Sequence, residues 1–163
     1  MIKVSEIAEK YADYEIDEKE LEKLLVKPIK SVWDLKKGDK YFILWSEGEV
    51  EYCKWNGDKI DVNRRACGNI FLTKEEAEFE VERKKCEAIM LKYGTRDMMS
   101  LGDVDTKKWL IRYNHNEKHL HLDYFNYLNS QGIILFASEE IAQQCIDEIG
   151  EDRLKKYIFN VKE

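Results

Sequence analysis

The chain has 163 residues, of which 44% are hydrophobic and 37% are charged, and its formal net charge is −6. That length suits one compact domain with a core of its own. The negative charge argues against duplex nucleic acid as the main partner, because phosphate contacts favour a basic face. The 27 basic residues are interspersed among 33 acidic ones, which is typical of a solvated mixed surface; an acidic surface that imitates nucleic acid is the alternative.

The cysteine pattern and the hydropathy predict a cytoplasmic protein. The N-terminus has no signal-peptide pattern, and no apolar run approaches the length of a membrane span. No two cysteines have the Cys-x-x-Cys spacing, so we expect reduced and mostly buried thiols rather than a disulfide framework. The cysteines are Cys53, Cys67, Cys86 and Cys145.

Residues 1–30 are expected to form a helical arm ahead of an α+β domain over residues 31–163. Asp17 is a favourable N-cap for a helix over residues 18–26, in which three leucines share one side. Pro28 ends this helix, because proline disfavours the helical conformation in itself and in the residue before it. The arm either packs on the domain or binds a partner.

The domain begins with predicted strands over residues 41–45 and 50–55, joined by a tight turn. Asn56 and Gly57 follow, a pair that favours a two-residue hairpin turn because both residues tolerate positive φ. The pattern therefore predicts a third strand over residues 58–62, which completes an antiparallel meander.

The strongest local pattern begins at a short apolar strand, residues 68–72. Thr73 then precedes Glu76 by three positions, which predicts a capping box and a helix that ends at Gly94. We expect this helix to pack across the sheets. Residues 88–91 are apolar all round, which predicts burial on two sides, either between two sheet units or in a homo-oligomer.

A second hairpin is predicted over residues 107–113 and 118–124, closed by a turn at residues 114–117. Its register is chosen so that apolar residues face each other and opposite charges pair. The expected pairs are Trp109 with Leu122, Ile111 with Leu120, Arg112 with His119 and Lys108 with Asp123.

The end of the chain repeats the earlier order of elements. A buried strand is predicted over residues 132–136, followed by a helix that Ser138 caps and that ends at Gly150. A last short helix is predicted over residues 151–159.

Residues 71–77 align with residues 136–142, which indicates two βα repeats over residues 31–94 and 106–150 plus a C-terminal helix. Convergent use of good caps is the alternative to duplication. The predicted fold is α+β, with antiparallel β-meanders that are each followed by a capped helix packed on the sheet, and with an N-terminal helical arm.

All three histidines lie close together in the sequence, and His119, His121 and Asp123 share one predicted strand face. Imidazoles and a carboxylate suit zinc or non-haem iron. Lys108 and Arg112 are expected opposite them and would repel a metal ion, so the preferred interpretation is a polar outer face, and we predict no metal site and no cofactor. A metal-dependent enzyme is the alternative.

No catalytic motif is recognisable. The sequence has no Gly-rich phosphate loop and no G-x-S-x-G nucleophile elbow, and no cysteine has a histidine near it in a known pattern. We therefore predict a binding protein rather than an enzyme.

Two sets of side chains are candidate binding residues. Exposed aromatics beside acidic residues favour a protein partner, whereas clustered basic residues favour nucleic acid. The first set is Trp45, Glu47, Glu49, Glu51 and Trp55, although core packing is the default interpretation of the two tryptophans by themselves. The second set, the basis of the alternative function, is Arg64, Arg65, Arg83, Lys84 and Lys85.

The stretches 31–35, 38–41 and 68–78 resemble a family of small phage and prophage proteins of Gram-positive bacteria, and residues 138–140 and 148–150 are similar to it too. The resemblance covers most of the chain after Ser31. It rests on a turn, a cap and a helix start, so it assigns no catalytic residue.

The resemblance implies a phage accessory protein made in the cytoplasm of an infected host cell. Small phage proteins of this sort often act by binding, and some inhibit bacterial defence nucleases. The expectation is therefore a non-enzymatic protein that binds a host or phage protein, with inhibition of a defence system such as a CRISPR nuclease as its most specific form. Nucleic-acid binding is the alternative function.

Overall fold

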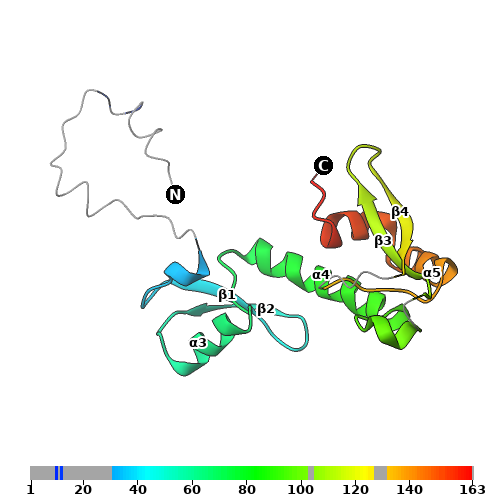
Figure 1. The fold of residues 1–163 in the computed structure, drawn as a ribbon. Coiled ribbons are helices and arrows are strands. Elements are labelled where there is room, and N and C mark those ends of the chain that lie inside the picture. The colour runs from blue at the N-terminus through cyan, green and yellow to red at the C-terminus, as the bar shows by residue number, and fades with distance from the viewer. Residues whose placement is uncertain (1–9, 11, 13–30, 103–104, 127–131, 163) are drawn as a thin grey trace. The chain divides into compact units, whose positions relative to one another are not determined.

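The computed structural model describes residues 10, 12, 31–102, 105–126 and 132–162 (Figure 1). The chain divides into two units, Met1–Leu35 and Lys36–Glu163. The predicted arm over residues 1–30 lies outside the described residues, apart from residues 10 and 12. In the rest of the first unit, a 3₁₀ helix, η1 (Val32–Asp34), begins at Ser31, whose hydroxyl accepts a hydrogen bond from the Trp33 amide. None of the described helices is long and apolar enough to cross a membrane.

The second unit begins with a hairpin of β1 (Lys40–Leu44) and β2 (Val50–Lys54), in which Phe42 lies opposite Tyr52. In the turn, the Trp45 amide donates to the Glu49 carbonyl at 2.9 Å. The two predicted strands are confirmed, and antiparallel hairpins followed by helices confirm the α+β class (Figure 1).

The predicted third strand over residues 58–62 is wrong, because this stretch belongs to helix α3 (Lys59–Ala66). Asp58 is its N-cap, and the carboxylate accepts from two amides of the first turn at 2.8 and 2.9 Å. The amides of Asn56 and Gly57 donate to Asp61 instead of closing a hairpin turn. Two aspartates therefore redirect a sequence that otherwise favours a β-turn.

Helix α4 (Lys74–Tyr93) begins and ends where the sequence predicts. The Thr73 hydroxyl accepts from the Glu76 amide at 3.2 Å, and the Glu76 carboxylate accepts from the Thr73 amide at 3.3 Å. Gly94 ends the helix in an extended conformation, with φ −135°, rather than in the left-handed one. Position 94 requires glycine for another reason, because a Cβ there would lie 2.5 Å from the Leu135 carbonyl oxygen.

Helix α4 packs on both parts of the second unit, as predicted, and it does so through opposite faces. The hairpin β1–β2 contacts the helix, and so do the C-terminal elements that follow β4 in the chain (Figure 1). Buried Ala77 and Cys86 are nine positions apart, which at about 100° per residue places them on opposite sides. Met90 is buried, but Ala88 and Leu91 are exposed. The expected burial of residues 88–91 on two sides is therefore wrong within this chain.

The second hairpin consists of β3 (Lys108–Asn114) and β4 (His119–Phe125), with Ile111 opposite Leu122. The predicted register, with Ile111 opposite Leu120, is wrong by two residues. The Asn114 carboxamide oxygen accepts from two amides of the turn, at 2.9 and 3.3 Å, which fixes a four-residue turn. A slip of two residues keeps every side chain on its face, so hydrophobic matching does not distinguish the registers.

The predicted strands over residues 68–72 and 132–136 each form isolated β-bridges instead of full ladders. Phe71 bridges to Phe42 of β1, and Phe136 bridges to Trp109 of β3. Both segments nevertheless cover the first strand of the preceding hairpin, as expected for buried extended chain.

The chain ends in three consecutive helical elements. Helix α5 (Glu139–Ile149) is capped by the Ser138 hydroxyl and ends at Gly150, whose φ of 88° favours glycine, as predicted. The predicted last helix over residues 151–159 is formed by a short α6 (Glu151–Arg153) that continues directly into the π-helical η3 (Leu154–Ile158). A 3₁₀ turn, η2 (Met98–Leu101), lies between α4 and β3. The main core joins buried residues of α4, β3 and these last helices, among them Cys86, Met90, Ile111, Phe136, Cys145, Ile146 and Leu154.

All four cysteines are free thiols, and they differ in exposure. Cys86 and Cys145 are buried, and burial raises the pKa of Cys86 and raises that of Cys145 to about 11. Cys53 is half-buried and Cys67 is exposed, so the prediction of mostly buried thiols holds for two of the four.

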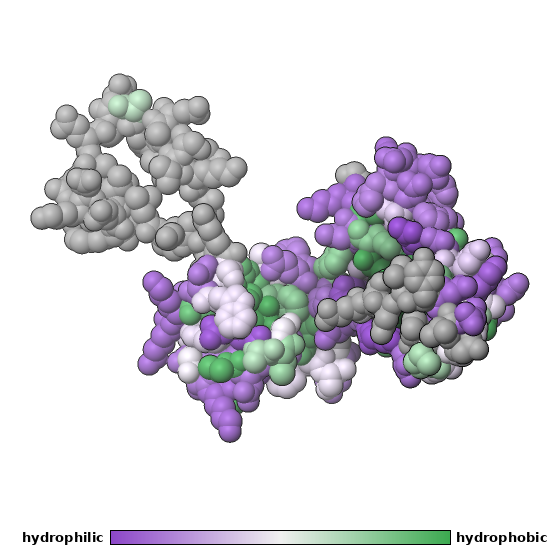
Figure 2. Space-filling view, viewed as in Figure 1, coloured by the Kyte–Doolittle hydropathy of each residue, from purple (hydrophilic) through white to green (hydrophobic). Residues whose placement is uncertain are grey.

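Figure 2 shows a largely hydrophilic surface with hydrophobic residues in separate patches.

Candidate functional site

A buried polar cluster joins helix α3 to the first hairpin. The Tyr41 hydroxyl donates to one Asp61 oxygen at 2.5 Å, and the other oxygen accepts from the amides of Asn56 and Gly57 at 2.6 and 3.0 Å. Asp61 is 3% exposed. Burial alone would raise its pKa, but these hydrogen bonds outweigh burial and lower the pKa of Asp61.

Arg64 extends the cluster towards the surface. Its Nη1 donates to the Tyr41 hydroxyl at 3.1 Å and to Cys53 Sγ at 3.5 Å. Burial, together with the hydrogen bond to Asp61, raises the pKa of Tyr41 to about 12. The polar groups of the cluster bind one another, so the cluster acts as a structural lock between α3 and the hairpin.

The lock supports an exposed tryptophan at the end of β1. Trp45 is 47% exposed, its indole Nε1 donates to Glu51 at 2.7 Å, and the Arg64 guanidinium lies 6.0 Å from its ring centroid. The indole is therefore exposed and at the same time held on two sides.

Trp55 does not share this surface, which corrects the sequence interpretation. It is 6% exposed and packs edge-on against Tyr41, with ring centroids 6.2 Å apart. The Arg65 guanidinium covers its ring at 4.5 Å. Core packing, the default interpretation for a strand tryptophan, is the observed state of Trp55.

The other predicted acidic residues surround the exposed indole. Glu47, Glu49 and Glu51 are all exposed, and they lie in the turn and on β2. The Ser46 hydroxyl holds the pKa of Glu47 below its usual range, so that carboxylate is charged at neutral pH. We call the set Trp45, Glu47, Glu49 and Glu51 the Trp45 surface.

A groove of about 590 Å³ lies between the turn of the first hairpin and helix α4. Val81 and Ala88 of α4 supply apolar wall, and Trp45 forms part of the opposite wall. Glu47 lies on the hairpin side, and Lys84 and Lys85 lie on the helix side. The groove thus continues the Trp45 surface with an apolar wall and with charges of both signs.

The five basic residues of the alternative function do not form one patch. Arg64 and Arg65 lie on α3 beside the two tryptophans, whereas Lys84 and Lys85 line the groove. Arg83 lines a different cavity together with Glu87. A continuous phosphate-binding surface would need these cations side by side.

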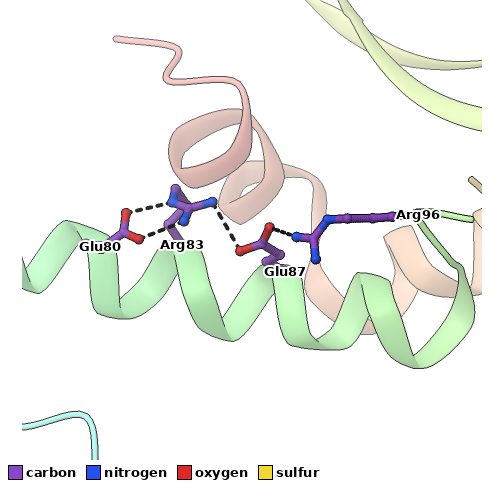
Figure 3. A network of polar contacts seen from close by, with 4 residues as sticks. All are labelled: Glu80, Arg83, Glu87 and Arg96. Carbon is purple, nitrogen blue, oxygen red and sulfur yellow. Dashed lines mark hydrogen bonds and ion pairs between the residues drawn. The ribbon is translucent and has the colours of Figure 1, made fainter. Parts of the chain in front are cut away.

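Acidic neighbours also bind several of these cations. Arg83 donates to Glu80 at 2.6 and 2.7 Å and to Glu87 at 3.3 Å, and Arg96 binds Glu87 as well (Figure 3). Lys85 pairs with Glu82 at 2.6 Å. Local ion pairs therefore neutralise much of the positive charge that the sequence concentrates there.

The predicted polar outer face of the histidine hairpin is found only near the turn: Arg112 and His119 are exposed, whereas Lys108, which the sequence places on the same face, is buried. The rings of His119 and His121 are 6.1 Å apart, and His119 approaches Glu117 at 3.5 Å. Asp123 pairs with Arg112 at 2.7 Å, and this hydrogen bond lowers the pKa of Asp123. Within the part of the chain that the structure describes, no three His, Cys, Asp or Glu side chains are placed to hold a metal ion.

Sequence reasoning missed Tyr41, Asp61 and the groove. The aspartate pair Asp58 and Asp61, three positions apart after a glycine, is the local signal that indicates a capped helix here. Comparison with known proteins adds no relative, since no family model, curated protein or solved structure matches this chain.

Proposed function

We propose that this chain binds another protein through the Trp45 surface. The observation that carries the proposal is the indole of Trp45, which is 47% exposed yet held by Glu51 and Arg64. A large aromatic side chain already fixed in one conformation loses little entropy on binding, and tryptophan is enriched among residues that dominate interface energies.

The charges around the indole indicate the chemistry of the partner. Three exposed glutamates favour a partner with a basic face, because complementary charge speeds association and selects among partners. Proteins that bind nucleic acid carry such faces. The resemblance to phage proteins makes a nuclease of a bacterial defence system, such as a CRISPR nuclease, the first partner to test, with the Trp45 surface competing for its nucleic-acid site.

The test is affinity purification from host cells with three chains as bait: the unaltered chain, Trp45→Ala and Tyr52→Ala. Trp45→Ala removes the proposed anchor. Tyr52→Ala removes a side chain that is 60% exposed on the opposite face of the same hairpin, so it is a matched control. We expect a protein that the unaltered chain and Tyr52→Ala both retain and that Trp45→Ala loses. Equal recovery of every captured protein by all three chains would refute the proposal.

A further inference from the structure

The dipeptide Asn56-Gly57, which lies between β2 and α3, has a chemical reactivity of its own. In an Asn-Gly pair, the backbone nitrogen of the glycine can attack the side-chain carbonyl carbon, Cγ, of the asparagine. The N–Cγ bond forms, the Cγ–Nδ2 bond breaks, and ammonia leaves with the proton that the glycine nitrogen gives up. Water then opens the five-membered succinimide ring at either carbonyl and produces aspartate or isoaspartate.

The fold keeps this reactive pair in the chain and leaves it accessible. Gly57 has a φ of 74°, in the left-handed region that favours glycine, so a bulkier and less reactive residue would be strained there. Asn56 is exposed, so water reaches its side chain. Whether the pair reacts therefore depends on what holds its backbone.

Asp61 fixes the backbone in a geometry that is wrong for the reaction. The amides of Asn56 and Gly57 donate to the same Asp61 oxygen, Oδ2, at 2.6 and 3.0 Å. Two successive amides converge on one oxygen only when they point to the same side of the chain, as in an anion-binding nest. Ring closure instead needs the Gly57 nitrogen beside the Asn56 Cβ. Because the Asn56 Cα is tetrahedral, that nitrogen cannot lie beside the Asn56 nitrogen and beside Cβ at once.

Asp61 also holds the proton that the reaction must remove. The Gly57 nitrogen becomes a nucleophile as it loses this proton. Burial opposes ionisation of Asp61, but its hydrogen bonds outweigh burial and lower its pKa, so the carboxylate is charged at neutral pH. A negative charge 3.0 Å away disfavours a second one on the Gly57 nitrogen. The Tyr41 hydroxyl, 2.5 Å from the other oxygen, keeps the carboxylate in place.

We propose that Asn56 is a site of spontaneous deamidation that the lock restrains, so that the reaction occurs when the Asn56 and Gly57 amides leave Asp61. The isoaspartate product has one additional main-chain carbon between these two amides, so they can no longer converge on one Asp61 oxygen. A transient opening of the lock is thereby made permanent. The proposal concerns the lock alone and does not depend on what the Trp45 surface binds.

The first measurement compares the folded chain with a blocked peptide of residues 54–59, both incubated at neutral pH. Mass spectrometry of digested samples detects replacement of the Asn56 –NH2 group by –OH, and chromatography against synthetic standards separates isoaspartate from aspartate. We expect the peptide to convert at least about tenfold faster than the folded chain. Equal rates would overturn the proposal, because the lock would then give no protection.

The second measurement distinguishes protection by Asp61 from protection by folding in general. Asp61→Asn replaces the charged acceptor with a neutral one, so deamidation of Asn56 should accelerate at least about tenfold. Gly94→Ala is the control, because it strains the approach to the Leu135 carbonyl and leaves the residues of the lock unchanged. It should alter the rate less than about threefold. Equal rates in the two variants would overturn the proposal, since global unfolding would then be the route.

The third measurement uses the unaltered chain, so it decides the case even if Asp61→Asn folds poorly. The Gly57 amide should exchange its hydrogen at least about tenfold more slowly in the folded chain than in the peptide, because Asp61 accepts from it. The purified isoaspartate form should unfold at a lower urea concentration than the unmodified chain. Exchange of Gly57 as fast as in the peptide, or equal urea midpoints for the two forms, would overturn the proposal.

Discussion

Replacing Asp61 with alanine tests the buried lock beneath the Trp45 surface. The substitution removes an acceptor that receives three hydrogen bonds, from the Tyr41 hydroxyl and from two backbone amides. Each bond to a charged acceptor contributes about 1.5 kcal/mol, and the Tyr41 hydroxyl that loses its acceptor is buried. We therefore expect the free energy of unfolding to fall by about 4 kcal/mol.

Urea denaturation followed by circular dichroism measures this loss. Asp61→Asn keeps the volume and one acceptor oxygen, so it should lose about half as much. Asp147→Ala, an exposed residue that accepts from Gln143 at 2.9 Å, is the matched control and should change stability by less than about 0.5 kcal/mol. A loss below about 1 kcal/mol for Asp61→Ala would refute the reasoning, because it would mean that the lock contributes no more than a surface hydrogen bond.

The same lock makes stability depend on pH with a definite sign. The folded protein lowers the pKa of Asp61, so the folded state binds the proton less tightly than the unfolded chain does. The stabilisation by Asp61 is therefore complete above the unfolded pKa of about 4 and is lost as the pH falls through the lower folded value. The stability difference between the unaltered chain and Asp61→Asn should shrink below about pH 4, and a difference that stays constant there would contradict the assignment.

Three further substitutions or reactions test individual elements. Gly94→Ala forces a Cβ to 2.5 Å from the Leu135 carbonyl, so it should lower the free energy of unfolding by about 2 kcal/mol or more. A loss near zero would show that the β-bridge between Thr95 and Leu135 is not tightly packed. Thr73→Ala removes the cap of α4 and should cost about 1 kcal/mol in urea denaturation, and Thr73→Ser should retain most of that stability; equal loss in both would contradict the cap. Cys67 should react with Ellman's reagent in the folded protein, whereas Cys145, which is buried and has its pKa raised to about 11, should react only on unfolding. Folded Cys145→Ser and folded unaltered chain should therefore release the same amount of thiolate product. A folded unaltered chain that labels as rapidly and as fully as it does in denaturant would show that the core is open.

Local patterns predicted those parts of the fold that local chemistry determines. The capping box of Thr73 and Glu76 lies within four residues, so a short stretch of sequence was sufficient to place the start of α4. The stop at Gly150 was visible for the same reason. The position of Gly94 was also right, but its cause is a tertiary approach to Leu135 rather than the local conformation expected.

The incorrect predictions concern segments whose structure depends on contacts or turns that the local pattern does not determine. Residues 58–62 carry both a turn signal and a helix cap, and the bond from Tyr41 to Asp61, twenty positions apart, is part of what holds α3 on the hairpin. The register of the second hairpin depends on the turn that Asn114 closes, which face-matching cannot distinguish.

The candidate site was predictable in its acidic residues and in Trp45, but not in its boundaries. Trp45 and Trp55 occupy similar sequence contexts, and their different exposure depends on which side chains cover each ring. Lys84 and Lys85 were grouped with arginines by sequence, whereas the helix turns them towards the groove beside Trp45 and turns Arg83 elsewhere.

The affinity of the captured partner for three chains, measured by isothermal titration calorimetry, tests the central claim most directly. We predict that Trp45→Ala weakens binding by at least about 2 kcal/mol, or roughly thirtyfold, and that Tyr52→Ala changes it less than threefold, or about 0.6 kcal/mol. Equal affinities for the unaltered chain and Trp45→Ala would show that the exposed indole is not the anchor of the interface.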